Sequence, residues 1–196
     1  MSINFYFTFL LVSTVLIYVD AVDPIKTYSI RKDFFTGIKG GEFSVRDPSG
    51  KHLYYRIESE YAILHTIKVI AYPSKQEIGR LKANLKPILY KADISILNAQ
   101  TNQWTHGVFQ QNLQILGSSF NIDWNGDQIR MESEPVSFTS KFYDKNSTLL
   151  AQFRLKPASV FWTKKYDMEI FSTKYPEQIY FLSMAARDQI VSSKHG

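Results

Sequence analysis

The chain has 196 residues and a formal net charge of +5, and it contains no cysteine. This length suits about one domain, with a core large enough to fold without covalent cross-links. The absence of cysteine excludes disulfides, thiol nucleophiles and cysteine-ligated zinc. The positive charge favours contact with anionic surfaces, but it is too small to indicate a nucleic-acid-binding protein.

An uncharged apolar run occupies residues 5–19 and is followed by the small residues of a signal-peptidase site. The run is shorter than the roughly 20 residues that span a bilayer, and it matches the apolar core of a secretory signal. We therefore predict a signal peptide at 1–21, cleaved before Val22, and one secreted domain at 22–196. Because the first basic side chains follow the run, an uncleaved membrane anchor is the alternative.

Short segments rich in apolar and aromatic residues, separated by turn residues, fill the body of the chain. In the clearest hairpin, Asn125-Gly126 supplies the positive φ angles that a tight turn requires. Many short strands at near-regular spacing indicate a β-barrel or a β-sandwich. The strands expected in chain order are 28–31, 42–47, 52–57, 63–72, 77–83, 88–97, 108–116, 120–123, 128–132, 136–142, 149–155, 160–162 and 167–171.

A polar turn between two of these strands contains the N-glycosylation sequon Asn146-Ser147-Thr148. A turn is accessible to the glycosylation machinery, and the predicted signal peptide would bring the chain to it. The sequence therefore predicts a glycan on Asn146.

A helix expected at residues 179–191 is apolar on every side, and its first half holds one polar side chain, Ser183. A surface helix keeps a polar face, whereas a helix that is apolar all round must be enclosed. We therefore predict that the strands wrap this helix and that it re-emerges into water at Arg187 and Asp188. The helix residues expected to be buried include Ile179, Phe181, Leu182, Ala186 and Ile190.

Four short sequence motifs follow one another in a recognisable order along the chain. They are Tyr28-Ser29-Ile30-Arg31, Phe43-Ser44-Val45 with Asp47 and Gly50, Tyr166-Asp167-Met168-Glu169-Ile170, and Ala185-Ala186-Arg187-Asp188 in the helix. In this order the chain resembles the tubby C-terminal-like superfamily, and within it the LURP-one-related proteins. The likeness covers about residues 27–192. It implies a closed antiparallel β-barrel of about twelve strands threaded by the C-terminal helix, and it suggests membrane lipid as a ligand class.

Basic side chains near strand ends are the candidate contacts for an anionic lipid head group. Arg80 and Lys82 share one face of a strand, Lys86 follows after a turn, and Lys164 and Lys165 lie at another turn. Turns gather at the rims of a barrel, so these side chains would form a positive rim, worth about 1 kcal/mol per basic residue near an anionic membrane. An ordinary solubilising surface is the alternative interpretation.

Paired carboxylates offer one enzymatic hypothesis. Glu58 with Glu60, and Glu132 with Glu134, lie about 6.6 Å apart at strand spacing, near the separation that glycosidases use. A solvated strand end is the favoured interpretation of both pairs. The oxygen-rich segment 123–127 fits an Asn-Gly hairpin better than a calcium loop, and no histidine spacing matches a zinc site, so we expect no metal or cofactor.

These features favour a non-enzymatic secreted binding protein that recognises anionic phospholipid or phosphoinositide head groups. The alternative is an extracellular protein-interaction module that binds a partner protein and no small molecule. A hydrolase that uses one of the carboxylate pairs is a third and much weaker hypothesis.

Overall fold

The computed structural model describes residues 22–33, 42–60, 65–84, 89–114, 116–135, 137–159 and 163–193. The predicted signal peptide at 1–21, Lys86 and the strand expected at 160–162 lie outside these residues.

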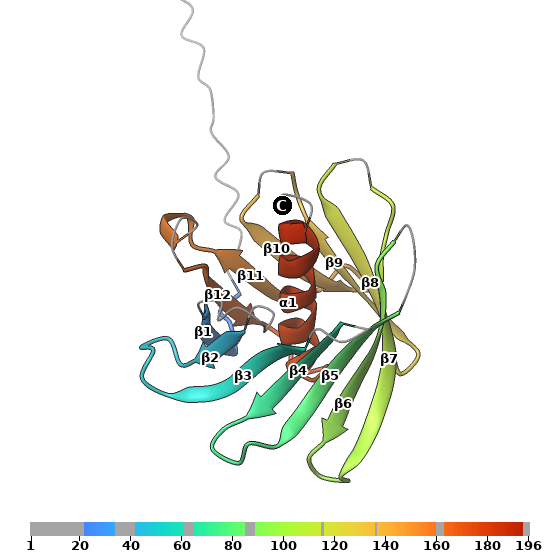
Figure 1. Ribbon diagram of the computed structural model, residues 1–196. Coiled ribbons are helices and arrows are strands. Elements are labelled where there is room, and N and C mark those ends of the chain that lie inside the picture. The colour runs from blue at the N-terminus through green and yellow to red at the C-terminus, as the bar shows by residue number, and fades with distance from the viewer. Residues whose placement is uncertain are drawn as a thin grey trace, which may run out of the picture.

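The described chain forms twelve antiparallel strands and a C-terminal helix (Figure 1). Their bounds are β1 Lys26–Lys32, β2 Phe43–Arg46, β3 Leu53–Glu60, β4 Thr66–Ala71, β5 Glu77–Asn84, β6 Lys91–Asn98, β7 Gln103–Gln111, β8 Ser118–Trp124, β9 Asp127–Ser133, β10 Thr139–Asp144, β11 Leu149–Leu155, β12 Lys165–Ile170 and α1 Gln178–Ser193, with a 3-10 turn at Pro157–Ser159. The strands follow one another in chain order, and β1 pairs with β12 to close the barrel. The predicted barrel around one C-terminal helix is therefore confirmed.

Because successive strands run in opposite directions, alternate connections lie at the same end of the barrel. We call the end that holds the β2–β3, β4–β5, β6–β7, β8–β9 and β10–β11 connections the turn end. Each of these connections contains at least one residue with positive φ, which glycine and asparagine adopt most readily. These residues are Gly50, Lys75, Asn102, Asn125, Gly126 and Ser147. The Asn-Gly hairpin predicted from the sequence is among them.

The opposite end, which we call the loop end, holds the β1–β2, β3–β4, β5–β6, β7–β8, β9–β10 and β11–β12 connections. The C-terminal half of α1 reaches this end, since Gln189 donates a hydrogen bond to Ser59 at the end of β3 (2.8 Å). The turn end and the loop end therefore receive opposite ends of the same helix.

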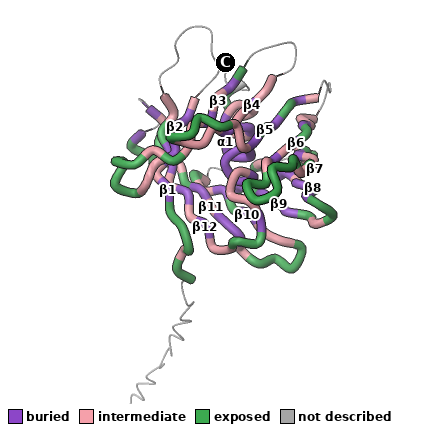
Figure 2. Tube along the Cα trace, turned by 90° about the horizontal axis from the view of Figure 1, so that it is seen from below, coloured by how far each residue is buried: buried purple, intermediate pink, exposed green. Residues whose placement is uncertain are grey.

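The barrel encloses the first half of α1. Every side chain from Ile179 to Ala186 is buried, and the burial-coloured view shows the helix surrounded by strands (Figure 2). The hydroxyl of Ser183 donates to the carbonyl oxygen of Ile179 (2.7 Å), so this buried polar group is satisfied within the helix. Ile190, which the sequence placed among the buried residues, is only partly buried.

The helix packs against small and branched side chains on one side and against aromatic rings on the other. On β5, a Cβ added to Gly79 would lie 3.3 Å from the Cβ of Gln178, so a side chain there would crowd the helix. Elsewhere, rings fill the space between helix and wall. Tyr180 meets Phe142 at 4.9 Å between ring centroids, and Phe181 meets Tyr28 at 5.3 Å. Edge-to-face contacts of this kind add to the burial of apolar area.

One expected strand was wrong in its bounds. The strand predicted at 108–116 is β7, Gln103–Gln111, and Leu116 lies beyond it with 68% of its surface exposed. The inward positions in the first half of β7 are Thr105 and Gly107, so the apolar alternation that marks a strand is missing there. A Cβ on Gly107 would lie 2.4 Å from the carbonyl oxygen of Asp123, which explains the glycine.

Substituting Leu182 by alanine tests the enclosure of α1. Leu182 is fully buried, so we expect Leu182→Ala to lower the free energy of unfolding by about 2–5 kcal/mol. Leu113→Ala is the matched control, because Leu113 is 84% exposed and its loss should change stability by less than about 0.5 kcal/mol. Urea unfolding measures both. Equal effects of the two substitutions would contradict the enclosure.

Candidate functional site

A carboxylate anchors the helix at the turn end. Glu177, which directly precedes α1, accepts hydrogen bonds from the hydroxyls of Tyr28 (2.8 Å) and Tyr55 (2.7 Å) and pairs with Lys26 (2.9 Å). Burial, followed by interaction with the Glu177 carboxylate, raises the pKa of both tyrosines, so their hydroxyls stay protonated and donate. A negative charge at a helix N-terminus is also favourable to the helix dipole.

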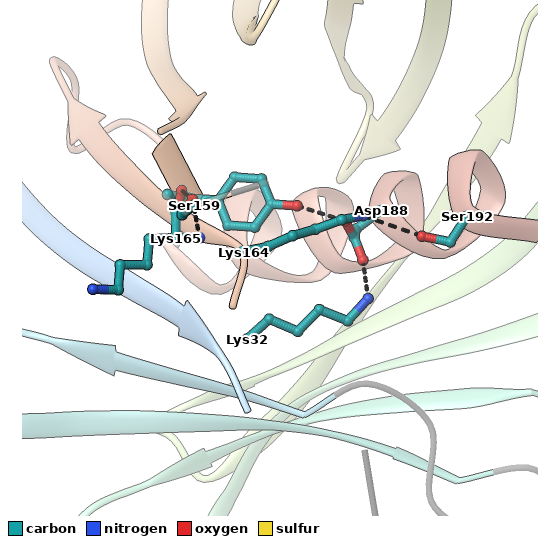
Figure 3. A network of polar contacts seen from close by, with 7 residues as sticks. Lys32, Ser159, Lys164, Lys165, Asp188 and Ser192 are labelled. Atoms are coloured by element: carbon teal, nitrogen blue, oxygen red, sulfur yellow. Dashed lines mark hydrogen bonds and ion pairs between the residues drawn. The ribbon is translucent and has the colours of Figure 1, made fainter. Parts of the chain in front are cut away.

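A second carboxylate anchors the helix at the loop end (Figure 3). Asp188 accepts hydrogen bonds from Lys32, Lys164 (2.7 Å) and Tyr166, which come from β1, the approach to β12 and β12 itself. Lys164 also reaches the hydroxyl of Ser192, one turn further along the helix (3.2 Å). The expected return to water at Asp188 was therefore wrong, because only 4% of this side chain is exposed.

The partners of Asp188 keep it charged. Burial is the largest influence and would raise the pKa of Asp188, but the charge of Lys32 and the hydrogen bond from Lys164 together hold the pKa below its ordinary value. Burial, then the charge of Asp188, raises the pKa of Tyr166, which keeps that hydroxyl a donor. The ion pairs therefore stabilise the folded state at neutral pH.

Arg187 adds a further cation at the loop end. Its guanidinium lies over the ring of Phe153, with 5.8 Å from its central carbon to the ring centroid, and its Nε has no hydrogen-bond partner within the described chain. Burial lowers the pKa of Arg187. Three cations, Lys32, Lys164 and Arg187, thus lie around Asp188 at this end of the helix.

Exposed apolar side chains lie at the same end. Leu113 and Leu116 belong to the β7–β8 connection, with exposed fractions of 84% and 68%, and Phe138 of the β9–β10 connection is 45% exposed. These three residues are named here the apolar rim. The two connections are neighbours, because a Cβ on Gly117 would lie 2.5 Å from the carbonyl oxygen of Ser133 and 3.4 Å from Pro135.

Four of the basic residues predicted as head-group contacts lie in the described part of the chain, on two separate walls of the barrel. Arg80 and Lys82 point outward from β5, where Arg80 pairs with Glu77 (2.6 Å) and lies over the ring of Trp104. Lys164 and Lys165 lie at the start of β12, and four strands, β1 to β4, separate them from β5. Lys164 and Lys165 therefore lie together at the loop end, and Arg80 lies on a different wall of the barrel.

The apolar rim and the Asp188 cluster were missed from the sequence. Leu113 and Leu116 fell within the strand expected at 108–116, so an exposed loop was not predicted there. Asp188 was interpreted as a solvated helix end, since its partner Lys32 is 156 residues away in the chain. In an up-and-down barrel, alternate connections lie at the same end. Comparing the apolar content of the two sets of connections could therefore have identified the apolar rim from the sequence.

The remaining candidates lie on exposed turns and walls. Asn146 is exposed at the tip of the β10–β11 turn, which Asp144 holds by accepting hydrogen bonds from two backbone N–H groups. Glu60 pairs with Lys68 (2.7 Å), and Glu132 pairs with Arg130 (2.8 Å). Among the residues that the structure describes, no group of three or more histidine, aspartate or glutamate side chains is placed to hold a metal ion.

Within that same part of the chain, no helix has both the length and the apolar character needed to cross a bilayer. The helix α1 has 16 residues, fewer than the roughly 20 that span a hydrocarbon core.

Comparison with known proteins gives one distant relative. The Type II methyltransferase M.AplI of Arthrospira platensis is 25% identical over 127 residues, which cover 64% of this chain and 35% of that protein. The chain thus spans about a third of this relative, and a likeness at this level does not transfer an activity to it. No family model and no solved structure matches the chain.

Acid titration of an Asp188 variant tests the loop-end ion pairs. Removing this charge leaves Lys32 and Lys164 facing each other, so we expect Asp188→Asn to cost about 3–5 kcal/mol at pH 7. The pKa of Asp188 is lower in the folded protein than in the unfolded chain. The loss of unfolding free energy in Asp188→Asn should therefore be complete above the ordinary aspartate pKa of about 3.9, and it should shrink as pH falls through the folded-state pKa of Asp188.

Unfolding by urea at a series of pH values measures this difference. Asp123→Asn on the exposed outer face of β8 is the control and should change stability by less than about 0.5 kcal/mol. An Asp188→Asn curve that runs parallel to wild type down to the lowest pH would contradict the pairing.

Proposed function

We propose that this protein is a non-enzymatic binding protein that docks its loop end on an anionic membrane surface. One observation carries the proposal: the exposed apolar rim lies at the same end of the barrel as the cations around Asp188. Proteins that bind reversibly to membranes combine apolar side chains that enter the interface with basic side chains that attract anionic lipid.

The exposure of the apolar rim supports its role in docking. Leucine and phenylalanine side chains exposed on neighbouring connections cost free energy in water, and exposed apolar side chains that gather on one face mark an interaction site. The turn end also exposes apolar side chains, since Val22 (71%) and Ile25 (58%) precede the start of β1 there. We favour the loop end for docking because it holds the exposed leucines together with Lys164 and Lys165.

The basic part of the surface rests on Lys164 and Lys165 at the start of β12. Lys165 is exposed and has no ion pair within the described residues, so its charge is available to a lipid phosphate. Lys164 pairs with Asp188, but Lys32 pairs with the same carboxylate, so two cations share one negative charge there. Arg80 and Lys82 on β5 are not needed for this docking.

The resemblance to the tubby C-terminal-like superfamily supports the same ligand class. We propose that the chain is a member related to the LURP-one-related proteins, with residues 22–196 as the barrel domain and 1–21 as a secretory signal. The closed barrel around a C-terminal helix is the fold that the resemblance implies. An extracellular module that binds a partner protein is the competing proposal, because an apolar rim also suits a protein interface.

Sedimentation with vesicles tests the membrane proposal. We expect the protein to pellet with vesicles containing phosphatidylserine or a phosphoinositide, and to remain in solution with phosphatidylcholine alone. High salt should release it, because screening weakens attraction between exposed charges. The double variant Leu113→Ser/Leu116→Ser should bind at least about tenfold more weakly, since burying each leucine contributes more than about 1 kcal/mol.

Two matched variants complete this experiment. Val22→Ser/Ile25→Ser removes a similar exposed apolar area from the segment before β1 and should leave vesicle binding unchanged. Lys165→Glu at the loop end should weaken binding, whereas Lys51→Glu at the turn end should not. If neither vesicle type retains the wild-type protein, the membrane proposal fails and the protein-interaction module takes its place.

Export is tested by the mass and N-terminus of the protein recovered from eukaryotic secretory cells. We expect a mature chain that begins at Val22 and carries an N-linked glycan on Asn146, removable by a peptide N-glycosidase. Thr148→Ala should abolish the glycan while leaving Asn146 in place. Recovery of a chain that retains Met1 and an unmodified Asn146 would contradict secretion.

A further inference from the structure

A polar groove runs along the outer wall of the barrel over β9 to β12, and at one end it reaches Ser137 and Thr139, the sequence neighbours of Phe138 in the apolar rim. It has a volume of about 460 Å³ and is lined by ten residues, none of them aliphatic. A volume of this size lies within the range of small-molecule sites. The β9–β10, β10–β11 and β11–β12 pairings place its side chains in two rows across the sheet.

Each row contains both hydrogen-bond donors and acceptors. The first row runs Glu132, Lys141, Gln152 and Glu169, and the second crosses Thr139, Arg154 and Asp167. Neighbouring strands lie about 4.8 Å apart, so adjacent members of a row can bind neighbouring polar groups of one ligand. An apolar ligand would cover these polar groups and leave them without hydrogen-bond partners, so the groove favours a polar ligand.

The charges around the groove balance. Four of its lining side chains are carboxylates, and Lys141 and Arg154 are cations. Two further cations flank it, since Arg130 pairs with Glu132 (2.8 Å) and Lys156 pairs with Asp167 (2.9 Å). The four carboxylates thus face four cations. A surface without net charge gives no advantage to a polyanion or a polycation, and it suits a neutral ligand.

Several groups in the groove are not used by the fold. Lys141, Arg154 and Glu134 make no side-chain hydrogen bond or ion pair with another residue that the structure describes, and all three are exposed. Gln152 donates to Glu169 (2.5 Å), which fixes the orientation of that amide. Free donors beside a fixed amide and carboxylates offer many hydrogen bonds to a ligand rich in hydroxyl groups.

We propose that this groove binds a neutral carbohydrate. Sugar hydroxyls donate and accept at once, so they can pair both with the carboxylates and with Lys141, Arg154 and Gln152. Most of the groove lies along the wall of the barrel, and only Glu134 and Ser137 of its lining belong to a loop-end connection. Its polar lining suits a different ligand from the apolar rim. A protein that reaches the outside of the cell meets such ligands on cell surfaces.

The test uses the folded full domain and an array of neutral oligosaccharides built from glucose, mannose, galactose and N-acetylglucosamine. We expect at least one group of oligosaccharides to bind, and titration calorimetry then gives its Kd. Arg154→Ala and Lys141→Ala should each weaken that binding at least about tenfold, as loss of a charge-assisted hydrogen bond does. Both side chains are exposed, so the variants should keep the Tm of the wild type.

Arg80→Ala on the opposite wall is the matched control, and its Kd should equal that of the wild type. Binding should change less than about twofold between low and high salt, because the ligand is neutral. The proposal is overturned if no neutral oligosaccharide binds, or if Arg154→Ala and Lys141→Ala bind as the wild type does. Gln152→Ala removes a groove amide without changing charge, so it should weaken oligosaccharide binding and leave vesicle binding unchanged, which separates this outcome from that of the docking proposal.

Discussion

The whole structure depends on enclosing a helix that is apolar on every side. Such a helix cannot rest on a surface, so the sheet must close around it. Enclosure leaves the polar groups at the two helix ends to be satisfied, and the barrel does this with paired tyrosines and lysines. Glu177 at one end and Asp188 at the other accept hydrogen bonds from side chains of β1, so one strand fixes the helix at both ends.

This arrangement divides the molecule into regions with different tasks. The interior is filled by packed side chains, and the turn end is built from hydrogen-bonded turns. The loop end combines the apolar rim with the cations around Asp188, and the wall over β9 to β12 is polar and balanced in charge. The groove extends along the wall from the loop end, where Glu134 and Ser137 lie next to the apolar rim, towards the middle of β9 to β12.

Much of the fold was predictable because it follows local rules. The alternation of apolar and polar residues marks most strands, and the composition of residues 179–186 requires enclosure. The start of β7 was missed because Thr105 and Gly107 replace large apolar residues at its inward positions. Asp188 was misassigned because Lys32, Lys164 and Tyr166 reach it only once the barrel has closed.

The most direct test of the enclosed helix is amide hydrogen exchange of residues 182–187 in the folded protein. If the barrel surrounds α1, these amides can exchange only when the barrel opens. Their free energy of exchange should then equal that of the inward-facing residues of β4 and β5. Exchange of α1 at a markedly lower free energy, with the strands still protected, would show that the helix leaves the barrel while the barrel persists, and it would contradict this account.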